Sequence, residues 1–327
     1  MKAVVYDRPG GANELHIGDV STPIPEGNEI LVKVYSTALN RADILQREGK
    51  YPPPAGASKI LGLEIAGEVY SVGSKVNKWK KGDQVFGLIP GGGYAEFAVI
   101  NELMANPIPA GLGYKEAAAI PEVFLTAYQA LIWHSLLQKG ERVLIHAGAS
   151  GVGTAAIQIA DIFGGEIYIT ASKSKHDLCK KLGARHTIDY KYENFAEVVK
   201  RITRNTGIDV IIDFIAGPYF KQNLDSLATD GRMVLLATLG GGRVSDTDIR
   251  QILTKRLTII GSTLRARTID YQIKLNTDFI KFAFDKFEKR ILKPVIDRVF
   301  DWKEVVEAHR YMEANRNTGK IILRISK

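Results

Sequence analysis

A single cysteine, Cys179, occurs among the 327 residues. One cysteine cannot form an intramolecular disulfide bond, and it excludes a zinc site built from several cysteines. A reducing compartment fits this composition, and we predict a cytoplasmic location. No apolar run has the length that crosses a bilayer. The first seven residues contain an acid and no long apolar core, so we expect neither a membrane span nor a secretory signal.

Long runs of basic residues are also missing, although the net charge is +8. A net positive charge can favour binding to nucleic acid, or it can attract a phosphorylated cofactor. Without a basic run, the sequence favours the cofactor over nucleic acid. Hydrophobic residues make up 45% of the chain and charged residues 24%, which is ordinary for a globular protein of about two domains.

Residues 1–120 have the pattern of a β-rich first domain. Residues 29–36 alternate between apolar and polar, as a half-buried strand does. Proline and glycine turns separate further strand candidates at 65–72, 84–89 and 94–100. Many short strands with regular turns indicate a barrel or a sandwich.

Strands and helices alternate in residues 121–267, which predicts a doubly wound parallel sheet with its ligand at the carboxyl ends of the strands. Residues 268–327 hold two helical patterns and two strands, and we expect them to return to the first domain and complete it. The six strands expected in the second domain are 143–147, 167–171, 187–190, 210–215, 233–237 and 257–260.

A glycine-rich turn follows the first strand of that sheet and opens a helix. Backbone N–H groups and the helix dipole make such a helix start an anion site. Gly151 and Gly153 have no Cβ, so a pyrophosphate can approach the backbone closely. We therefore expect Ser150, Gly151, Val152 and Gly153 to hold the pyrophosphate of a dinucleotide.

The second strand lacks the acid that would bind the ribose 2′-hydroxyl of NAD. Ser172, Lys173, Ser174 and Lys175 follow it instead. Hydroxyl and ammonium groups suit a 2′-phosphate, which favours NADPH. The alternative is that Ser172 or Ser174 caps a helix while the lysines lie in solvent.

Five stretches together resemble one known family, the medium-chain dehydrogenase/reductase superfamily. Within it, the resemblance is to zinc-free quinone oxidoreductases of the zeta-crystallin type, which include stress-inducible animal enzymes, and it covers nearly the whole chain. It implies a GroES-like β-barrel catalytic domain followed by a six-stranded parallel Rossmann domain. The stretches are 38–43, 62–67, 118–122, 146–153 and 311–320.

The same resemblance implies that no zinc is bound. Alcohol dehydrogenases of the superfamily have a zinc-ligating cysteine in place of Asn40 and a histidine in place of Leu63. Leucine cannot ligate zinc, and without a Lewis acid alcohol oxidation loses its activation. A quinone or an activated alkene is already electrophilic, so we predict NADPH:quinone oxidoreductase activity on a small molecule held in the interdomain cleft. The alternatives are reduction of enones or enals, and a role in RNA binding or as a crystallin-like structural protein.

The resemblance also implies an assembly and a set of catalytic residues. Relatives usually form dimers through their cofactor domains, and some form tetramers; residues 257–260 are the candidate edge strand. Asn40, Asp43 and Tyr51 are implied to lie beside the nicotinamide and the substrate. The alternatives are helix capping for Asn40 and Asp43, and a surface aromatic beside prolines for Tyr51.

The resemblance implies further cofactor contacts, and several of these residues could instead have a purely structural role. The alternatives are ordinary helix packing for Thr126, a half-exposed aromatic at a strand end for Tyr190, and a solvated surface charge for Arg265. Whether Lys173 or Lys175 meets the 2′-phosphate stays open. The implied contacts beyond the pyrophosphate loop are Thr126, Ser172, Lys175, Tyr190, Leu239, Gly240, Leu264, Arg265 and Asn317.

Overall fold

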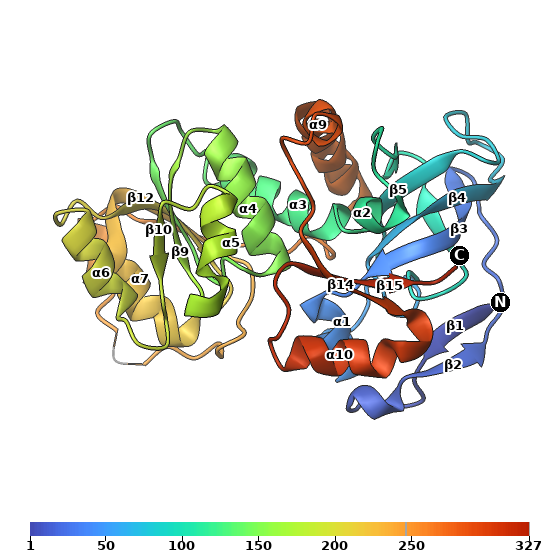
Figure 1. The fold of residues 1–327 in the computed structure, drawn as a ribbon, viewed down its shortest axis with the longest axis horizontal. Coiled ribbons are helices and arrows are strands. Elements are labelled where there is room, and N and C mark those ends of the chain that lie inside the picture. Colours follow the sequence, from blue (N-terminus) through green and yellow to red (C-terminus); the bar gives the residue numbers. More distant parts are fainter. Residues whose placement is uncertain (246, 327) are drawn as a thin grey trace. The chain divides into compact units, whose positions relative to one another are not determined.

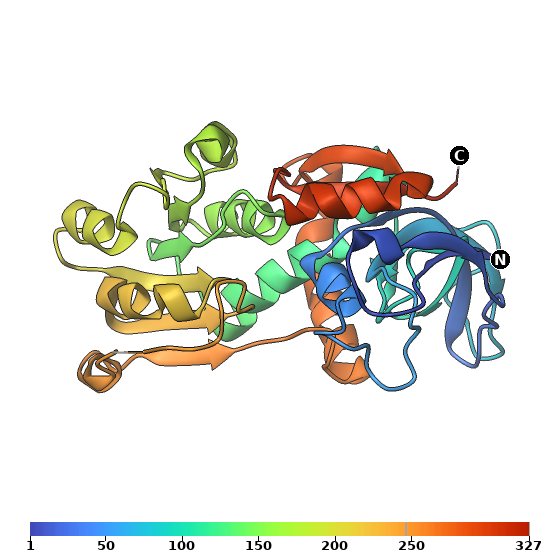
Figure 2. The same cartoon turned by 90° about the horizontal axis from the view of Figure 1, so that it is seen from below.

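The computed structural model describes residues 1–245 and 247–326. These residues form two compact units. The first unit consists of Met1–Leu125 and Arg265–Lys327, and the second of Thr126–Leu264. Both chain ends therefore belong to the first unit (Figures 1 and 2). Within the described ranges, no helix is both long and apolar enough to cross a membrane.

The first unit is built on a seven-stranded sheet in which one strand has three partners. This strand, β3 (Glu29–Ala38), pairs with β4 along one edge. Its other edge pairs with β6 over its first half and with β15 over its last residues. The sheet therefore wraps around a core, and Ile30, Val32 and Val34 of β3 are fully buried. The strand order is β14 (Ile296–Asp301), β15 (Lys320–Arg324), β3, β4 (Glu64–Val72), β5 (Gln84–Leu88) and β7 (Ala105–Pro107), with β6 (Phe97–Asn101) on β3; β1 (Lys2–Val5) and β2 (His16–Asp19) pair separately.

Helices from both ends of the chain cover this sheet. The rings of Phe124, Phe279 and Phe287 contact one another and join α3 to α9. The first unit extends past the predicted limit at residue 120 because the first turn of α3 belongs to it. The helices are α1 (Arg41–Arg47), α2 (Tyr114–Ala118), α3 (Pro121–Tyr128), α9 (Ile269–Glu288) and α10 (Val305–Glu313).

The second unit confirms the predicted six-stranded parallel sheet. All five strand pairs are parallel. The least accurate prediction concerns β12, which begins at Leu227 rather than near 233. Its first half contains Asp230 and Gly231, which read as a turn, and Asp230 has a φ of 62°. The order is β10 (His186–Ile188), β9 (Glu166–Thr170), β8 (Arg142–Ile145), β11 (Ile208–Asp213), β12 (Leu227–Leu235) and β13 (Thr258–Gly261).

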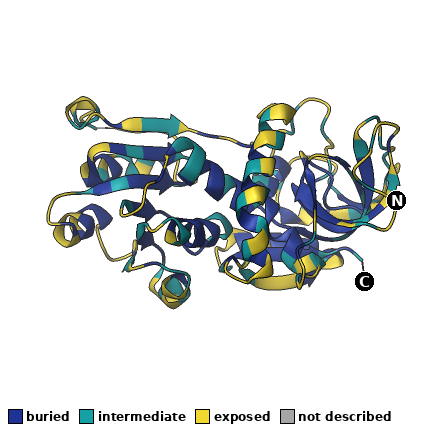
Figure 3. Cartoon of the chain, turned by 90° about the horizontal axis from the view of Figure 1, so that it is seen from above, coloured by how far each residue is buried: buried dark blue, intermediate teal, exposed yellow. Residues whose placement is uncertain are grey.

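Helices in the second unit follow the strands as expected for a doubly wound sheet. α6 and α7 lie against each other (Figure 1) and pack with Leu144, Tyr168 and Ile211 of the sheet. Buried residues run along the inner strands, whereas exposed residues lie on the outer sides of the helices and on the edge strand β13 (Figure 3). The helices are α4 (Gly151–Ile162), α5 (His176–Lys181), α6 (Phe195–Ile202), α7 (Phe220–Ser226) and α8 (Arg250–Thr254).

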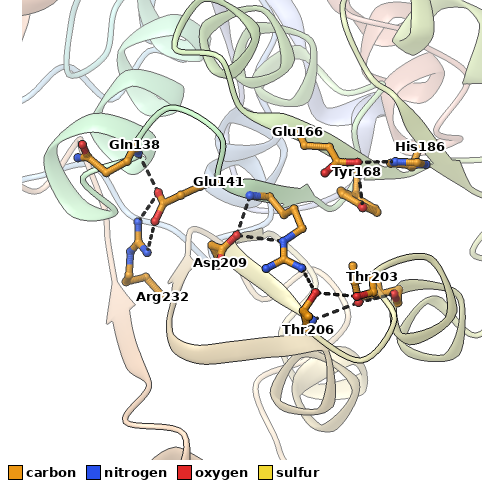
Figure 4. Close-up of polar contacts among 12 residues, drawn as sticks. Gln138, Glu141, Glu166, Tyr168, His186, Thr203, Thr206, Asp209 and Arg232 are labelled. Carbon is orange, nitrogen blue, oxygen red and sulfur yellow. Dashed lines mark hydrogen bonds and ion pairs between the residues drawn. The ribbon is translucent and has the colours of Figure 1, made fainter.

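Ion pairs join the strands of the second unit at their amino ends (Figure 4). The guanidinium of Arg232 on β12 donates to both carboxylate oxygens of Glu141, at 2.8 and 2.7 Å. Arg142 binds Asp209 at 2.8 and 3.2 Å, and His186 contacts Glu166 at 2.9 Å. The charged side chains at the amino ends of the strands thus bind one another. We therefore look for the ligand site at the carboxyl ends.

We expect the Glu141–Arg232 pair to contribute to stability. Although burial raises the pKa of Glu141, hydrogen bonds from Arg232 and the Gln138 N–H leave it lowered. Its contribution is therefore present above the unfolded pKa of about 4.3 and is lost as the pH falls through the folded pKa. Glu141→Gln should cost about 1–3 kcal/mol in urea unfolding at pH 7, because two charge-assisted bonds are lost.

The matched control is the exposed pair of Asp230 and Arg256, which has the same forked geometry at 2.7 Å. Asp230→Asn should cost less than about 1 kcal/mol, because water screens exposed pairs. Equal losses for the two variants, or a loss in Glu141→Gln that does not shrink below pH 4, would contradict the prediction.

Candidate functional site

The glycine-rich turn of the second unit has the geometry of an anion site. Ser150 caps α4, and its Oγ accepts a hydrogen bond of 3.1 Å from the Gly153 N–H. The N–H groups of Gly151 and Val152 have no partner among the residues that the structure describes. A Cβ on Gly153 would lie 2.4 Å from the Ala147 carbonyl oxygen, so only glycine lets the turn pack this closely. The helix dipole and two unpaired donors therefore favour a phosphate here.

A buried polar chain supports the strand ends beneath this turn. His146 is fully buried, as expected of a packed side chain, and its ring nitrogens contact Thr170 at 3.0 Å and Asn223 at 2.8 Å. Burial lowers the pKa of His146, so the imidazole is neutral at pH 7. Asn223 in turn donates to Asp213 at 2.9 Å. The chain links the carboxyl ends of β8, β9 and β11 and holds them in register.

Ser172 and its neighbours lie at the carboxyl end of β9, next along the same edge. The residues Lys173–Lys175 form one turn of 3₁₀ helix, and the Ser172 side chain makes no capping hydrogen bond there. The residue before α5 is Lys175, and Ser174 does not cap that helix either. Lys173 is exposed, whereas Lys175 is partly buried. The hydroxyl groups are thus not used for helix capping, which was the alternative to a phosphate site.

Other predicted cofactor residues of the second unit follow neighbouring strands. Tyr190 comes two residues after β10 and is 47% exposed. The N–H groups of Leu239 and Gly240 bond to the loop after β11, at 3.0 Å each. A pocket of about 600 Å³ opens beside Gly240. The turn after β8 and the loops after β9, β10 and β12 therefore lie at one edge of the sheet.

Three predicted residues lie elsewhere. Thr126 is partly buried in α3, and Leu264 is buried at the last position of the second unit. Asn317 belongs to the first unit, where its side-chain amide donates to the Gly319 carbonyl at 2.8 Å.

A buried charged cluster forms the centre of the first unit. Lys320 on β15 is 3% exposed, and its ammonium donates to Glu64 Oε1 at 2.8 Å, Asn40 Oδ1 at 2.6 Å and the Leu39 carbonyl at 2.9 Å. The Asn40 amide donates to the same Glu64 oxygen at 2.8 Å. The second Glu64 oxygen accepts from the Glu122 N–H at 2.9 Å. The polar atoms of Asn40 are thus directed at Lys320 and Glu64.

Asp43 is also buried, and it fixes the start of α1. Its carboxyl group accepts from the Asn40 N–H at 2.8 Å, the Gly62 N–H at 2.9 Å and the Tyr94 hydroxyl at 3.2 Å. Burial raises the pKa of Asp43 to about 6, and these hydrogen bonds oppose the rise. The contact with the Asn40 N–H is that of a capping box, so the capping alternative describes what Asp43 does here.

Arg265 and Tyr51 form a second pair in the first unit. Arg265 is 7% exposed, so it is not a solvated surface charge. It donates to the Pro90 carbonyl at 2.8 Å and to Gln46 at 2.7 Å, and its guanidinium lies 5.5 Å from the centre of the Tyr51 ring. Its Nη1 is buried and has no hydrogen-bond partner within the described part of the chain. A buried unpaired donor costs free energy, which a carbonyl oxygen would recover.

Sequence reasoning did not select Glu64, Glu122 or Lys320 as site residues. The signal for Lys320 is its place directly before the apolar run Ile321, Ile322 and Leu323, since a lysine buried with that run needs a partner. Nothing local identifies that partner, because Glu64 lies 256 residues earlier.

The donor groups of this cluster do not fit a zinc ion. Zinc sites in proteins use thiolate, imidazole and carboxylate ligands. Leu63 offers no donor atom, and the Asn40 amide already binds Lys320 and Glu64. The Lys320 ammonium would repel a second cation at this place. Among described residues, no three histidine, cysteine or acidic side chains gather as a metal site.

Replacing Lys320 by methionine should destabilise the first unit strongly. Glu64 is fully buried, and it would lose its only cationic partner within the described residues. Breaking a buried pair from one side costs about 3–5 kcal/mol. Urea unfolding should show this loss for Lys320→Met, and Lys320→Met with Glu64→Gln should recover part of it. Lys281→Met, at an exposed position of α9, is the control; a loss for Lys320→Met no larger than the control's would count against the cluster.

Comparison with known proteins agrees with this fold. Residues 26–110 match the family model of the alcohol dehydrogenase GroES-like domain, and residues 151–280 match that of zinc-binding dehydrogenases. The quinone oxidoreductase of Homo sapiens is 31% identical over 99% of this chain and 97% of its own length. That identity is modest, so it establishes the family rather than closeness to one animal enzyme.

Two solved structures extend the comparison. The CurK enoyl reductase is 30% identical with a TM-score of 0.87, over 99% of this chain and 98% of that one. The mycobacterial protein Rv1454c complexed with NADPH is 26% identical with a TM-score of 0.90, over 99% of this chain and 100% of that one. On these likenesses and its two-unit fold, the chain belongs to the medium-chain dehydrogenase/reductase superfamily of oxidoreductases.

Proposed function

We propose that this protein is a zinc-independent NADPH:quinone oxidoreductase. The observation that carries the proposal is the buried Lys320–Glu64–Asn40 cluster, which engages Asn40, the residue that by resemblance takes the place of a zinc-ligating cysteine. Without a Lewis acid, an alcohol oxygen is not activated, whereas a quinone is already electrophilic and needs mainly a hydride donor and hydrogen-bond donors. The name of the human relative supports the same substrate class.

The cofactor would bind along the carboxyl edge of the second unit's sheet. The unpaired N–H groups of Gly151 and Val152 would hold the pyrophosphate, next to Ser150 and Gly153. When bound, the nicotinamide supplies the hydride. The NADPH complex of the mycobacterial relative supports this cofactor. The remaining proposed contacts are Thr126, Ser172, Lys175, Tyr190, Leu239, Gly240, Leu264, Arg265 and Asn317.

In the first unit, we assign the substrate to Tyr51 and Arg265. The Tyr51 ring offers a face for stacking on a quinone, and the unpaired Arg265 Nη1 offers a donor for its carbonyl oxygen. Asn40 and Asp43 would be positioning residues rather than groups that contact the substrate. Their polar atoms already bind Lys320, Glu64 and the backbone at the start of α1.

The second candidate is reduction of an activated double bond, as in enones. The likeness to the CurK enoyl reductase favours it. An enone also presents a carbonyl oxygen to Arg265, so the two candidates share one site.

We also propose a homodimer, or a tetramer built from it. The strand β13 is an edge of the six-stranded sheet, and its outer side has no partner strand in the described chain. Pairing with a second copy would cover that edge.

Cofactor preference tests the phosphate site. Lys175→Ala should raise the dissociation constant for NADPH about 10–100-fold and leave that for NADH unchanged, because one charge-assisted contact to the 2′-phosphate is worth roughly 1.5–3 kcal/mol. Fluorescence titration of both cofactors measures this. Lys173→Ala is the matched control at the exposed neighbour and should change little. If wild type binds NADPH and NADH equally, the 2′-phosphate assignment is wrong; an effect in Lys173→Ala alone moves it to Lys173.

Steady-state oxidation of NADPH tests the reaction. With an ortho-quinone and an enone compared, we expect the larger kcat/KM for the quinone and no loss of activity after treatment with a zinc chelator. A preference for the enone would select the second candidate. Turnover with neither compound would overturn both.

A further inference from the structure

Three acidic residues belong to the charged cluster of the first unit or adjoin it through backbone hydrogen bonds, and their carboxyl groups differ in their partners. Glu64 is bound by Lys320, Asn40 and the Glu122 N–H. Asp43 accepts three hydrogen bonds. The carboxyl group of Glu122, by contrast, has no hydrogen bond or ion pair with any residue in the described ranges. It is a partly buried acid without a partner.

The nearby cations do not compensate a charge on Glu122. All three N–H bonds of the Lys320 ammonium are used by Glu64, Asn40 and the Leu39 carbonyl. Arg265 forms no ion pair with Glu122 among the described contacts. Burial and the negative charge of Glu64 raise the pKa of Glu122 to about 8; Asp43 adds to the rise, while Lys320 and Arg265 oppose it. The side chain is thus mainly protonated at pH 7.

Glu122 also acts electrostatically on the proposed substrate residues. Its charge acts on Tyr51, whose pKa is raised by burial first and by Glu122 second. Arg265 lies over the same Tyr51 ring. Tyr51 and Glu122 are each partly exposed, so neither side chain is closed off from a bound molecule.

We propose that Glu122 is the acid that delivers the proton taken up by the substrate during reduction. This inference rests on the proposed function. Reduction of a quinone to a hydroquinone consumes one hydride, which the nicotinamide supplies, and one proton. The O–H bond of Glu122 breaks, an O–H bond forms on the substrate oxygen, and the carboxylate regains a proton from water. The same balance holds for an enone, with the proton added to carbon.

The geometry allows this role to be separated from a structural one. The contact of Glu122 with Glu64 runs through its backbone N–H, which a side-chain substitution leaves in place. Glu122→Gln keeps the size of the side chain and removes the acidic proton, so the variant should fold and bind NADPH as wild type does.

Stopped-flow reduction of an ortho-quinone by NADPH, measured from pH 6 to 9, tests the proposal. A group that acts as an acid supports turnover below its pKa, so the wild-type rate should fall as the pH rises through about 8. Glu122→Gln should lower kcat about 100-fold or more at pH 7 and abolish that fall. Glu122→Asp should restore part of the rate together with the pH dependence. Glu307→Gln, at an exposed site of α10, is the control.

A second readout needs neither cofactor nor turnover. The infrared difference spectrum between wild type and Glu122→Gln should contain the C=O band of a protonated carboxyl group, which disappears as the pH is raised through about 8. Subtraction of the variant isolates Glu122 from Asp43 and Glu64.

The outcomes separate the two proposals. A wild-type protein that reduces neither quinone nor enone overturns the proposed function, and this inference with it. A wild type that is active while Glu122→Gln keeps its kcat and pH profile overturns this inference alone. An infrared spectrum in which Glu122 is ionised at pH 6–7 does the same.

Discussion

The buried ion pair between Lys320 and Glu64 is the contact on which the first unit depends. It joins the last strand of the chain, β15, to β4, and Asn40 links both to the start of α1. A buried pair gains little over an apolar contact, but it is expensive to break from one side. The pair therefore adds little net stability, but it determines where β15 packs. Lys320 is neutralised only when β15 lies where its ammonium reaches Glu64 of β4.

That constraint also determines how the neighbouring carboxyl groups behave. Glu64 forms the ion pair with Lys320, and Asp43 accepts hydrogen bonds from the backbone N–H groups of Asn40 and Gly62. Glu122 is the third acid. It lies at the beginning of α3 and forms no ion pair with any described residue. A single lysine among three acids thus produces two carboxyl groups used for structure and one that is available for proton transfer.

The sequence predicted the second unit better than the first because its signals are local. Apolar strands, helical periodicity and the glycine turn at Gly151 each occupy a few consecutive residues, and parallel pairing follows from their alternation. The start of β12 was missed because Asp230 and Gly231 look like a turn. In the first unit, the sequence offers helix capping as a role for Asn40 and Asp43, but it does not predict the cluster around them, because Lys320 and Glu64 are 256 residues apart. The sequence pattern draws attention to Lys320 beside an apolar run, but it does not identify Glu64 as its partner.

The same cluster limits the chemistry that the site can perform. A catalytic zinc ion polarises a substrate oxygen, whereas every N–H bond of Lys320 is turned inward to Glu64, Asn40 and a backbone carbonyl. The cluster therefore cannot activate a weak electrophile. The unpaired donor that remains nearby is Arg265 Nη1, one hydrogen bond rather than a metal charge. A substrate reduced here has to be electrophilic already. A hydrogen bond from Arg265 to its oxygen and a proton from Glu122 would then act on the same substrate.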